Sequence, residues 1–131
     1  MIRIRALENK EKKRIKPFIS KIFPNANFTI KNSDEIFVYE IDSSPVAFAH
    51  LREYLRGTVL LGFGVLEDFR GQGIGKQLLS FVVNLAEKSH KTIYLKVRKN
   101  NHAAVSLYKS FGFRIIKRKG DRLIMKRACF S

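Results

Sequence analysis

The feature that most constrains this chain is a glycine-rich loop that joins an apolar strand to an amphipathic helix. Residues 58–65 form an apolar run that predicts a buried strand, and a short acidic turn, Glu67-Asp68, follows it. Three glycines then occur within five residues, immediately before a pattern of helical period. The free N–H groups of such a loop and the positive end of the helix dipole converge on one point. The stretch therefore predicts an anion-binding cradle, where glycine lets the backbone approach a phosphate.

Two common phosphate-binding loops are excluded by spacing. A Walker A loop requires Ser or Thr after its Gly-Lys pair, whereas Gly75-Lys76 is followed by Gln77. A dinucleotide fingerprint requires G-x-G-x-x-G, whereas the glycines here follow G-x-G-x-G, and no βαβ unit with a ribose-binding acid comes after them. The alternative to a ligand-binding loop is an ordinary glycine turn before a surface helix.

The loop resembles the acetyl-CoA loop of the GNAT family of N-acetyltransferases. That pattern is Gln or Arg, two residues of any type, Gly, one residue of any type, and Gly or Ala, and Arg70, Gly73 and Gly75 match it. The stretch Asn101-x-x-Ala104-x-x-Leu107-Tyr108-x-x-x-Gly112-Phe113 resembles the family's second signature, which opens and closes the next helix. The two motifs occur in the family's order with a predicted strand between them. The resemblance is strong over residues 58–127 and weak before them.

Hydrophobic periodicity predicts seven strands and four helices in a single domain, residues 1–131. The strands are expected at 2–5, 35–41, 46–51, 58–65, 92–97, 113–119 and 122–127, and the helices at 8–16, 17–23, 73–89 and 103–110. In the third helix the apolar stripe is expected to be Ile74, Leu78, Phe81, Val82 and Leu85. The resemblance implies an α/β (α+β) fold with a mixed, mostly antiparallel sheet. It further implies that the fourth and fifth strands splay apart and that the thioester lies between them.

The composition limits the protein's surroundings and partners. No run approaches about 18 apolar residues, and no signal peptide is visible, so we expect a cytoplasmic protein without a membrane span. A single cysteine, Cys129, and three scattered histidines show no metal-binding spacing, so no metal is expected. The net charge of +15 attracts anions. Coenzyme A is a polyanion but needs only a few of these charges. The remaining positive charge could serve an acidic protein substrate, a nucleic-acid or ribosomal partner, or no specific partner.

The resemblance implies which residues bind acetyl-CoA. Main-chain groups of the strand segment Phe63, Gly64 and Val65 would pair with the pantetheine amides. The loop residues Arg70, Gly71, Gln72, Gly73, Ile74, Gly75 and Lys76 would hold the pyrophosphate through their N–H groups. Asn101 would hydrogen-bond the pantetheine arm, and the alternative is that it simply caps the following helix.

Tyr108 is the expected catalytic residue, and also a cofactor contact. Coenzyme A leaves as a thiolate that needs a proton, and a phenol with a reference pKa of about 10 can donate it. The alternative is a core tyrosine on the apolar side of its helix. The general base is unassigned, because Lys96 occupies the position where acetylases of ribosomal proteins carry a glutamate. Glu53, Glu67 or Asp68 acting through water are candidates, whereas His50 is expected to be a partly buried, hydrogen-bonded histidine.

These features predict an acetyl-CoA-dependent N-acetyltransferase that transfers an acetyl group to a primary amine by direct attack in a ternary complex. An α-amine of pKa about 7.7–8 loses its proton at pH 7 at a cost of about 1–1.4 kcal/mol, against about 4–5 kcal/mol for a lysine side chain. Without a strong base, a protein α-amine is therefore the easier acceptor. The alternative is a non-catalytic module on the same fold that binds acyl-CoA or, through its basic surface, nucleic acid. We expect the protein to be a monomer or a homodimer.

Overall fold

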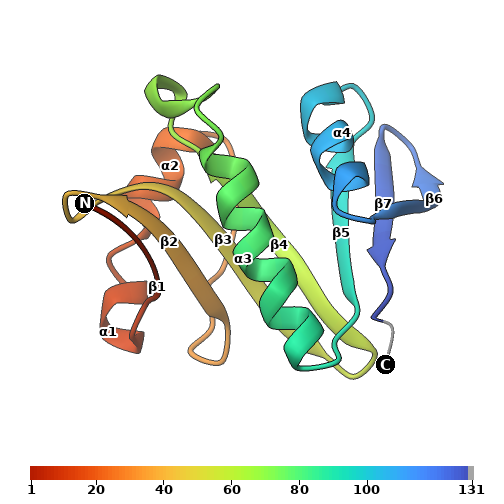
Figure 1. Ribbon diagram of the computed structural model, residues 1–131, viewed down its shortest axis with the longest axis horizontal. Coiled ribbons are helices and arrows are strands. Elements are labelled where there is room, and N and C mark those ends of the chain that lie inside the picture. Colours follow the sequence, from red (N-terminus) through yellow and green to blue (C-terminus); the bar gives the residue numbers. More distant parts are fainter. Residues whose placement is uncertain (130–131) are drawn as a thin grey trace.

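The computed structural model describes residues 1–129 and has one seven-stranded sheet at its centre (Figure 1). The strand order is β1-β2-β3-β4-β5-β7-β6, and every neighbouring pair is antiparallel except β4–β5. The strands are β1 (Ile2–Ala6), β2 (Glu35–Ile41), β3 (Ser44–Tyr54), β4 (Gly57–Val65), β5 (Ile93–Arg98), β6 (Arg114–Lys119) and β7 (Arg122–Arg127). The expected mixed and mostly antiparallel sheet is confirmed.

Helices cover the two faces of the sheet unequally (Figure 1). The helices are α1 (Asn9–Lys12), α2 (Lys16–Ile22), α3 (Ile74–Lys88) and α4 (His102–Ser110), and a 3-10 turn spans Glu67–Phe69. Residues of α3 and α4 pack with alternate residues of β2 to β7 in the larger core, on the face that we call the front. Residues of α2 pack with the intervening residues of β2 and β3 in a smaller core on the back face. None of the helices within residues 1–129 is long and apolar enough to cross a membrane.

The expected strands lie where periodicity placed them, and most bounds agree within one or two residues. The third strand is longer than expected, Ser44–Tyr54 instead of 46–51. It begins early because Asp42 and Ser43, with φ of +49° and +68°, form a two-residue hairpin turn. Such a primed turn matches the twist of the two strands that it joins.

The helix expected at 8–16 is present but shorter than expected, because α1 is a single turn, Asn9–Lys12. Pro17 separates the two helices as expected: its ring clashes with the carbonyl four residues earlier and it has no N–H, so a continuous helix through this point is disfavoured. A separate helix, α2, then begins at Lys16 with Pro17 in its first turn. The side chain of Lys12 turns inward, where Nζ donates to the carbonyl oxygen of Asn32 at 2.8 Å.

Helix α3 confirms the predicted helix, with Gly73 and Ser89 as its caps, but its buried stripe differs from the expected one. Leu85 is 38% exposed and Phe81 is half-buried, packing edge-on against Phe37. The helix is rotated so that its buried side consists of Ile74, Leu78, Leu79, Val82, Val83 and Ala86. The stripe faces the sheet along its whole length, which places the start of α3 beside the end of β4.

Strands β4 and β5 are paired only at one end, which confirms the expected splay. Residues 58–60 of β4 pair in parallel with residues 93–95 of β5. Beyond that point the rest of β4 pairs with β3, and the rest of β5 pairs with β7. The strands therefore diverge towards Val65 and Arg98, leaving an opening in the sheet.

Candidate functional site

The loop before α3 has a backbone conformation that requires glycine. Gly71 and Gly73 have φ of +79° and +81°, in the left-handed region that L-residues rarely adopt. A Cβ atom at either position would meet nothing within 4 Å, so conformation and not crowding demands glycine here. Gly73 ends this turn and is the N-cap of α3.

The main-chain donors of this loop are unpaired within the protein. Among residues 1–129, no protein group accepts from the N–H groups of residues 71–76, and the first helical bond runs from Gln77 N–H to the Gly73 carbonyl at 3.0 Å. Arg70 differs from the sequence expectation, because its N–H is bonded to the Glu67 carbonyl at 3.2 Å. Six adjacent donors at the positive end of a 15-residue helix are the arrangement that an anion-binding site requires.

The open edge of β4 lies next to this loop, and a β-bulge determines which groups it presents. His50 pairs with Gly62 and Leu51 with Leu60, so Leu61 is the extra residue of the bulge. Near one end the Thr58 N–H points towards β5 and bonds Thr92, whereas beyond β4 the Leu66 N–H points towards β3 and bonds Val46. In a regular strand the main-chain N–H groups of residues eight apart would point to the same side. The bulge at Leu61 has therefore reversed the side to which the later main-chain groups of β4 point.

As a result, the main-chain groups of Phe63 and Val65 point away from β3 and into the opening. The guanidinium of Arg70 confirms this direction, since its Nε donates to the Val65 carbonyl at 3.0 Å. This arrangement is the one an added strand requires, with donors and acceptors presented at an unpaired edge. Arg70 thus contributes to the site through its side chain, holding the loop to the end of β4.

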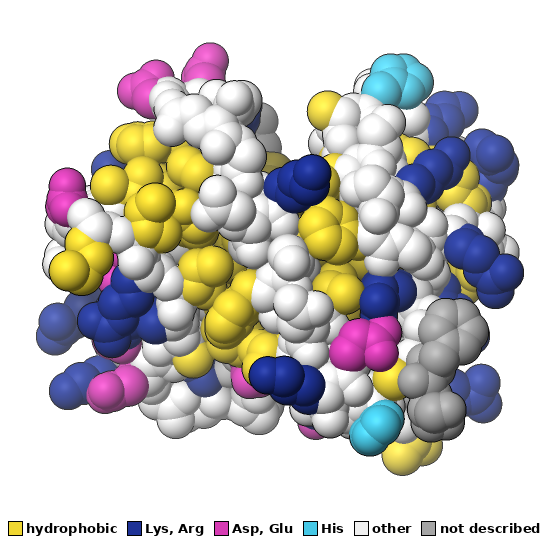
Figure 2. Space-filling view, viewed as in Figure 1, with side chains coloured by type: hydrophobic (Ala, Val, Ile, Leu, Met, Phe, Trp, Pro, Cys, Tyr) yellow, Lys and Arg dark blue, Asp and Glu magenta, His cyan; other side chains and the backbone are white. Residues whose placement is uncertain are grey.

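Two glycines of the site serve different purposes. A Cβ at Gly64 would lie 2.7 Å from Ile22 Cγ2, so this glycine allows α2 to pack closely on the back of β4. A Cβ at Gly75 would instead lie 3.5 to 3.9 Å from Val65, Phe63 and Leu107 side chains, on the front face. Gly75 therefore keeps space free between the start of α3, the end of β4 and α4, where Figure 2 shows a notch in the surface.

Helix α4, which carries Tyr108, is fixed at both ends. Asn101 Oδ1 accepts from the Ala104 N–H at 3.2 Å, so Asn101 acts as the N-cap of this helix. At the other end Gly112, with φ of +90°, closes a Schellman motif in which Gly112 N–H bonds Lys109 and Phe113 N–H bonds Tyr108. Gly112 therefore ends the helix as the second signature implied, and Asn101 forms the cap that was the alternative to its role as a pantetheine contact, which stays a prediction.

Tyr108 lies between two aromatic rings at the opening. Its ring centroid is 6.2 Å from that of Phe63 and 5.6 Å from that of Phe113. Only 7% of the residue is exposed, and this burial raises the pKa of the phenol to about 12. No group of residues 1–129 forms a hydrogen bond with the Tyr108 hydroxyl. Every fully buried polar side-chain atom in that range has a hydrogen-bond partner, so the unpaired hydroxyl must be accessible at the surface. The phenol is thus protonated at neutral pH and free to donate.

The candidate bases are distributed unevenly around the opening. Glu53 forms an ion pair with Lys91 and is the partner of Thr58 in the ladder, about 23 Å along the strand from Val65. Glu67 and Asp68 lie in the exposed 3-10 turn between β4 and the loop. Lys96 is exposed on the back face of β5, immediately beyond the last residue paired with β4. The opening therefore has a cation at the position where a base was sought.

A buried polar network lies on the back of the sheet, and sequence reasoning missed most of it. Asp34, 1% exposed, accepts from His50 Nε2 at 2.8 Å and from two nitrogens of Arg52 at 2.8 Å each. Burial alone would raise the Asp34 pKa, but hydrogen bonds from Arg52, the Lys31 N–H and His50 hold it far below its usual range. His50 is hydrogen-bonded as expected, but it is 3% exposed and so fully instead of partly buried. The two-residue spacing of His50 and Arg52 along one strand was the signal that could have placed both on the same face.

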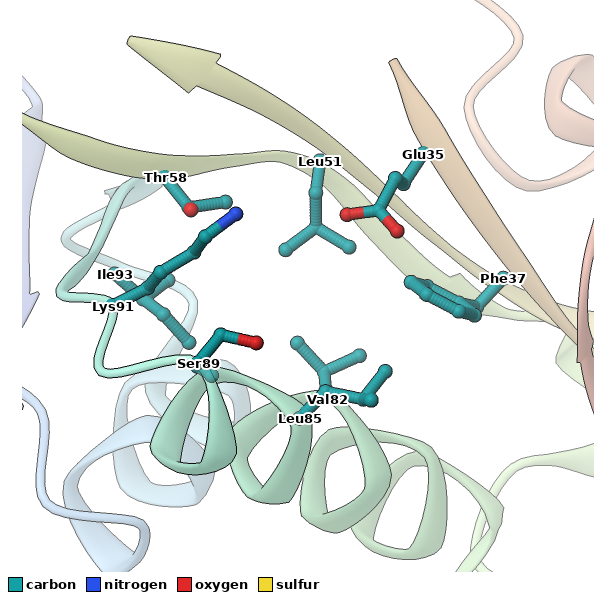
Figure 3. A pocket seen from close by; sticks show the side chains of 10 residues that line it. Glu35, Phe37, Leu51, Thr58, Val82, Leu85, Ser89, Lys91 and Ile93 are labelled. Carbon is teal, nitrogen blue, oxygen red and sulfur yellow. The ribbon is translucent and has the colours of Figure 1, made fainter. Parts of the chain in front are cut away.

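A separate cavity of about 150 Å³ lies between the last turns of α3 and the sheet (Figure 3). Figure 3 shows the side chains of Glu35, Lys91 and Ser89 around an apolar interior that includes Phe37 and Ile93. It is at the far end of α3 from the glycine loop. Within residues 1–129, no group of three His, Cys, Asp or Glu side chains is arranged to hold a metal ion.

Comparisons with known proteins agree with the fold. The model of the acetyltransferase (GNAT) family matches residues 2–113, so the chain belongs to the GNAT acetyltransferase family. N-alpha-acetyltransferase 50 from Danio rerio is 39% identical over 62 residues, covering 46% of this chain and 37% of that protein. The matched regions span between 37% and 65% of the lengths of the curated relatives.

Two solved structures show how widely the fold is shared. The ribosomal-protein-S18-alanine N-acetyltransferase from Escherichia coli superposes with a TM-score of 0.84 at 22% identity, covering 100% of this chain and 97% of that one. The PaiA N-acetyltransferase from Thermoplasma acidophilum, solved in complex with coenzyme A, gives a TM-score of 0.81 at 17% identity, covering 98% and 99%. At these identities the comparison establishes the GNAT fold.

Proposed function

We propose that this protein is an acetyl-CoA-dependent N-acetyltransferase that acts on the α-amine of a protein. The observation that carries the proposal is the set of six unpaired N–H groups, residues 71–76, beside the open edge of β4. Membership of an acetyltransferase family and the likeness to a structure with bound coenzyme A support it. Any α-helix leaves about four N–H groups unpaired at its start, and here the loop residues Gly71 and Gln72 add two more beside them.

The residues fit the parts of the coenzyme in order. The pyrophosphate would accept hydrogen bonds from residues 71–76 and face the positive end of α3. The pantetheine amides would pair with the main chain of Phe63 and Val65, an arrangement that requires Arg70 Nε to release the Val65 carbonyl. The space next to Gly75 would admit the pantetheine arm where it runs along the main chain of β4. The thioester would then lie close to Tyr108.

Tyr108 would act in the second half of the transfer. The acceptor nitrogen bonds to the acetyl carbonyl carbon, the carbon–sulfur bond breaks, and the sulfur leaves with the electron pair as a thiolate. The phenol of Tyr108 donates its proton to that sulfur and is later reprotonated from solvent. The proton lost by the amine passes to water, so the reaction needs no strong protein base when the acceptor is an α-amine.

The choice of a protein α-amine rests on energetics and on relatives. At pH 7 an α-amine is deprotonated at a cost of about 1–1.4 kcal/mol, about 3 kcal/mol less than a lysine side chain. Curated relatives include an N-alpha-acetyltransferase and a ribosomal protein alanine N-acetyltransferase.

The experiment is a panel of peptides incubated with labelled acetyl-CoA and followed by mass spectrometry. The panel contains peptides with a free α-amine and no lysine, and matched peptides with a blocked α-amine and one lysine. We expect one acetyl group on the first set and little on the second. Acetylation of the lysine set alone would refute the α-amine specificity, and acetylation of neither set together with unaltered acetyl-CoA binding would indicate a binding module.

A further inference from the structure

The back of the β5–β7–β6 part of the sheet carries a concentrated set of cations. Residues directly opposite one another in neighbouring strands share a face, so the ladder determines its members. Lys96 and Arg98 on β5 pair with Ile124 and Arg122 on β7, and β6 continues the same face. We call this surface the basic face, and its cations are Lys96, Arg98, Arg114, Lys117, Lys119, Arg122 and Lys126.

The basic face is poorly neutralised. Residues 96–127 contain 11 Lys and Arg and one acidic residue, Asp121, which gives this segment +10 of the chain's +15. Asp121 lies 3.3 Å from Arg98 and 3.7 Å from Arg122, at one end of the face. Within residues 1–129 no other carboxylate forms an ion pair with any of the seven cations. Such a surplus attracts a polyanion.

No helix within residues 1–129 covers this surface. The back-face core consists of α2, β2 and β3 residues with their neighbouring loops, and it contains no residue of β5, β6 or β7. Helices α3 and α4 lie on the front, where Arg127 of β7 is bonded to Glu87 and to the Phe111 carbonyl. Figure 1 shows α1 and α2 beside β1 to β3, away from β6 and β7. The basic face is therefore open to solvent, and Lys96, Arg114 and Lys117 are exposed.

The basic face begins where the sheet opens. Leu95 is the last β5 residue paired with β4, and Lys96 is the next. An acceptor whose amine reaches the thioester through the gap between β4 and β5 would leave its following residues on the back of β5, β7 and β6. A chain lying there must cross the cations.

We propose that the basic face binds an acidic, extended segment of the acceptor protein, downstream of the amine that is acetylated. This inference rests on the proposed function. Alternate residues along a strand lie about 6.6–6.8 Å apart, which is the spacing of same-side residues in an extended peptide. The cations at Lys117 and Lys119, and at Lys96 and Arg98, have this separation, so a segment with acidic residues at alternate positions is complementary to them.

A peptide fits this surface better than a nucleic acid does. Proteins that bind single-stranded nucleic acid without sequence preference present aromatic side chains on which the bases stack. Tyr94 is the one aromatic residue of the three strands on this face, and the Lys126 ammonium already lies 5.7 Å from its ring centroid. The basic face thus supplies charge without a stacking platform.

The test uses two acceptor peptides that share their first residues and differ downstream, where one has Glu and the other Gln at alternate positions. Lys117 and Arg118 provide a matched pair of variants, since they are adjacent, both exposed, and on opposite faces of β6. Lys117→Glu and Arg118→Glu change the net charge equally. We expect wild type to favour the Glu peptide by about tenfold in kcat/KM, Arg118→Glu to keep that preference, and Lys117→Glu to lose it.

Equal rates with both peptides, or equal losses in both variants, would overturn the proposal, because the general field of the protein would then explain any effect. Should Lys117→Glu fail to fold, Lys117→Gln is expected to move the preference in the same direction.

Binding of a fluorescent Glu peptide with a blocked amine, followed by anisotropy, separates this proposal from the proposed function. Weaker binding in Lys117→Glu alone supports the basic face even if no peptide is acetylated. Tighter binding of a uridine oligonucleotide than of the Glu peptide, weakened by Lys117→Glu, would overturn it in favour of nucleic acid.

Discussion

The ring of Tyr108 lies 6.2 Å from the ring of Phe63, measured between centroids, with an interplanar angle of 63°. This contact joins α4 to the half of β4 that has no partner in β5. Phe63 belongs to the segment whose main chain faces the opening, so the same residue would position the pantetheine arm and support the proton donor. The proposed donor would therefore be held relative to the coenzyme by the sheet itself.

Replacing Tyr108 by Phe is expected to remove turnover and to leave cofactor affinity unchanged. The two residues differ by the hydroxyl, which bonds no group of residues 1–129, so the packing with Phe63 and Phe113 is retained. Loss of a general acid costs about 10² to 10⁴ in kcat. Steady-state kinetics and acetyl-CoA titration of both proteins check this, and wild-type turnover in Tyr108→Phe would mean that the tyrosine is a core residue only.

The raised pKa of Tyr108 predicts a stability change at alkaline pH. Its folded pKa of about 12 exceeds the unfolded value of about 10, so its contribution is fully present below pH 10 and is lost as the pH rises towards 12. The loss amounts to about 2–3 kcal/mol at the limit. Chemical denaturation at pH 8 and pH 11.5 measures it. Tyr108→Phe is the control, because other groups titrate equally in both proteins, and equal losses in the two would contradict the assignment.

Local patterns predicted the parts of the site that lie close together in sequence. The glycine loop, the start of α3 at Gly73 and the ends of α4 depend on residues within a few positions of one another, and these were located correctly. Strand 35–41 was also located to the residue. The break near Pro17 was also predicted, but the helix expected at 8–16 ends at Lys12, and periodicity did not show that early end.

Features that depend on distant residues were not predictable. The bulge at Leu61 depends on the register between β3 and β4, and it alone turns the main chain of Phe63 towards the opening. The Asp34 network joins residues 16 and 18 positions apart in sequence through contacts that no local pattern reveals. The sequence showed only that the chain has a large positive charge. The pairing of β5, β7 and β6 was needed to show which cations lie on the same face of the sheet.

Gly75 and Gly64 predict opposite effects of the same substitution. Gly75→Ala adds a methyl group at ordinary contact distances on the front face, so the free energy of unfolding should change by less than about 1 kcal/mol while acetyl-CoA binding weakens. Gly64→Ala places a methyl group 2.7 Å from Ile22 Cγ2 and should destabilise by about 1–3 kcal/mol through overpacking. Thermal unfolding and acetyl-CoA titration compare the two. Unchanged affinity in Gly75→Ala would show that the cofactor does not approach this residue.

Asp34 is expected to be the most sensitive position outside the opening. Its carboxylate is fully buried between His50 and Arg52, so Asp34→Asn leaves the guanidinium without its counter-ion and should cost about 3–5 kcal/mol at pH 7. The Asp34 pKa is depressed in the folded protein, so the stability that this carboxylate provides is present above its unfolded pKa of about 4 and is lost as the pH falls below that value. Denaturant unfolding of wild type and Asp34→Asn at pH 7 and pH 3 tests both statements, because the gap between the two proteins should narrow in acid. Asp42→Asn is the matched control, since Asp42 pairs with the N-terminus at the exposed surface and its loss should change the free energy of unfolding far less. A gap that stays constant between the two pH values would show that Asp34 stabilises the fold by hydrogen bonding and shape, with no contribution from its charge.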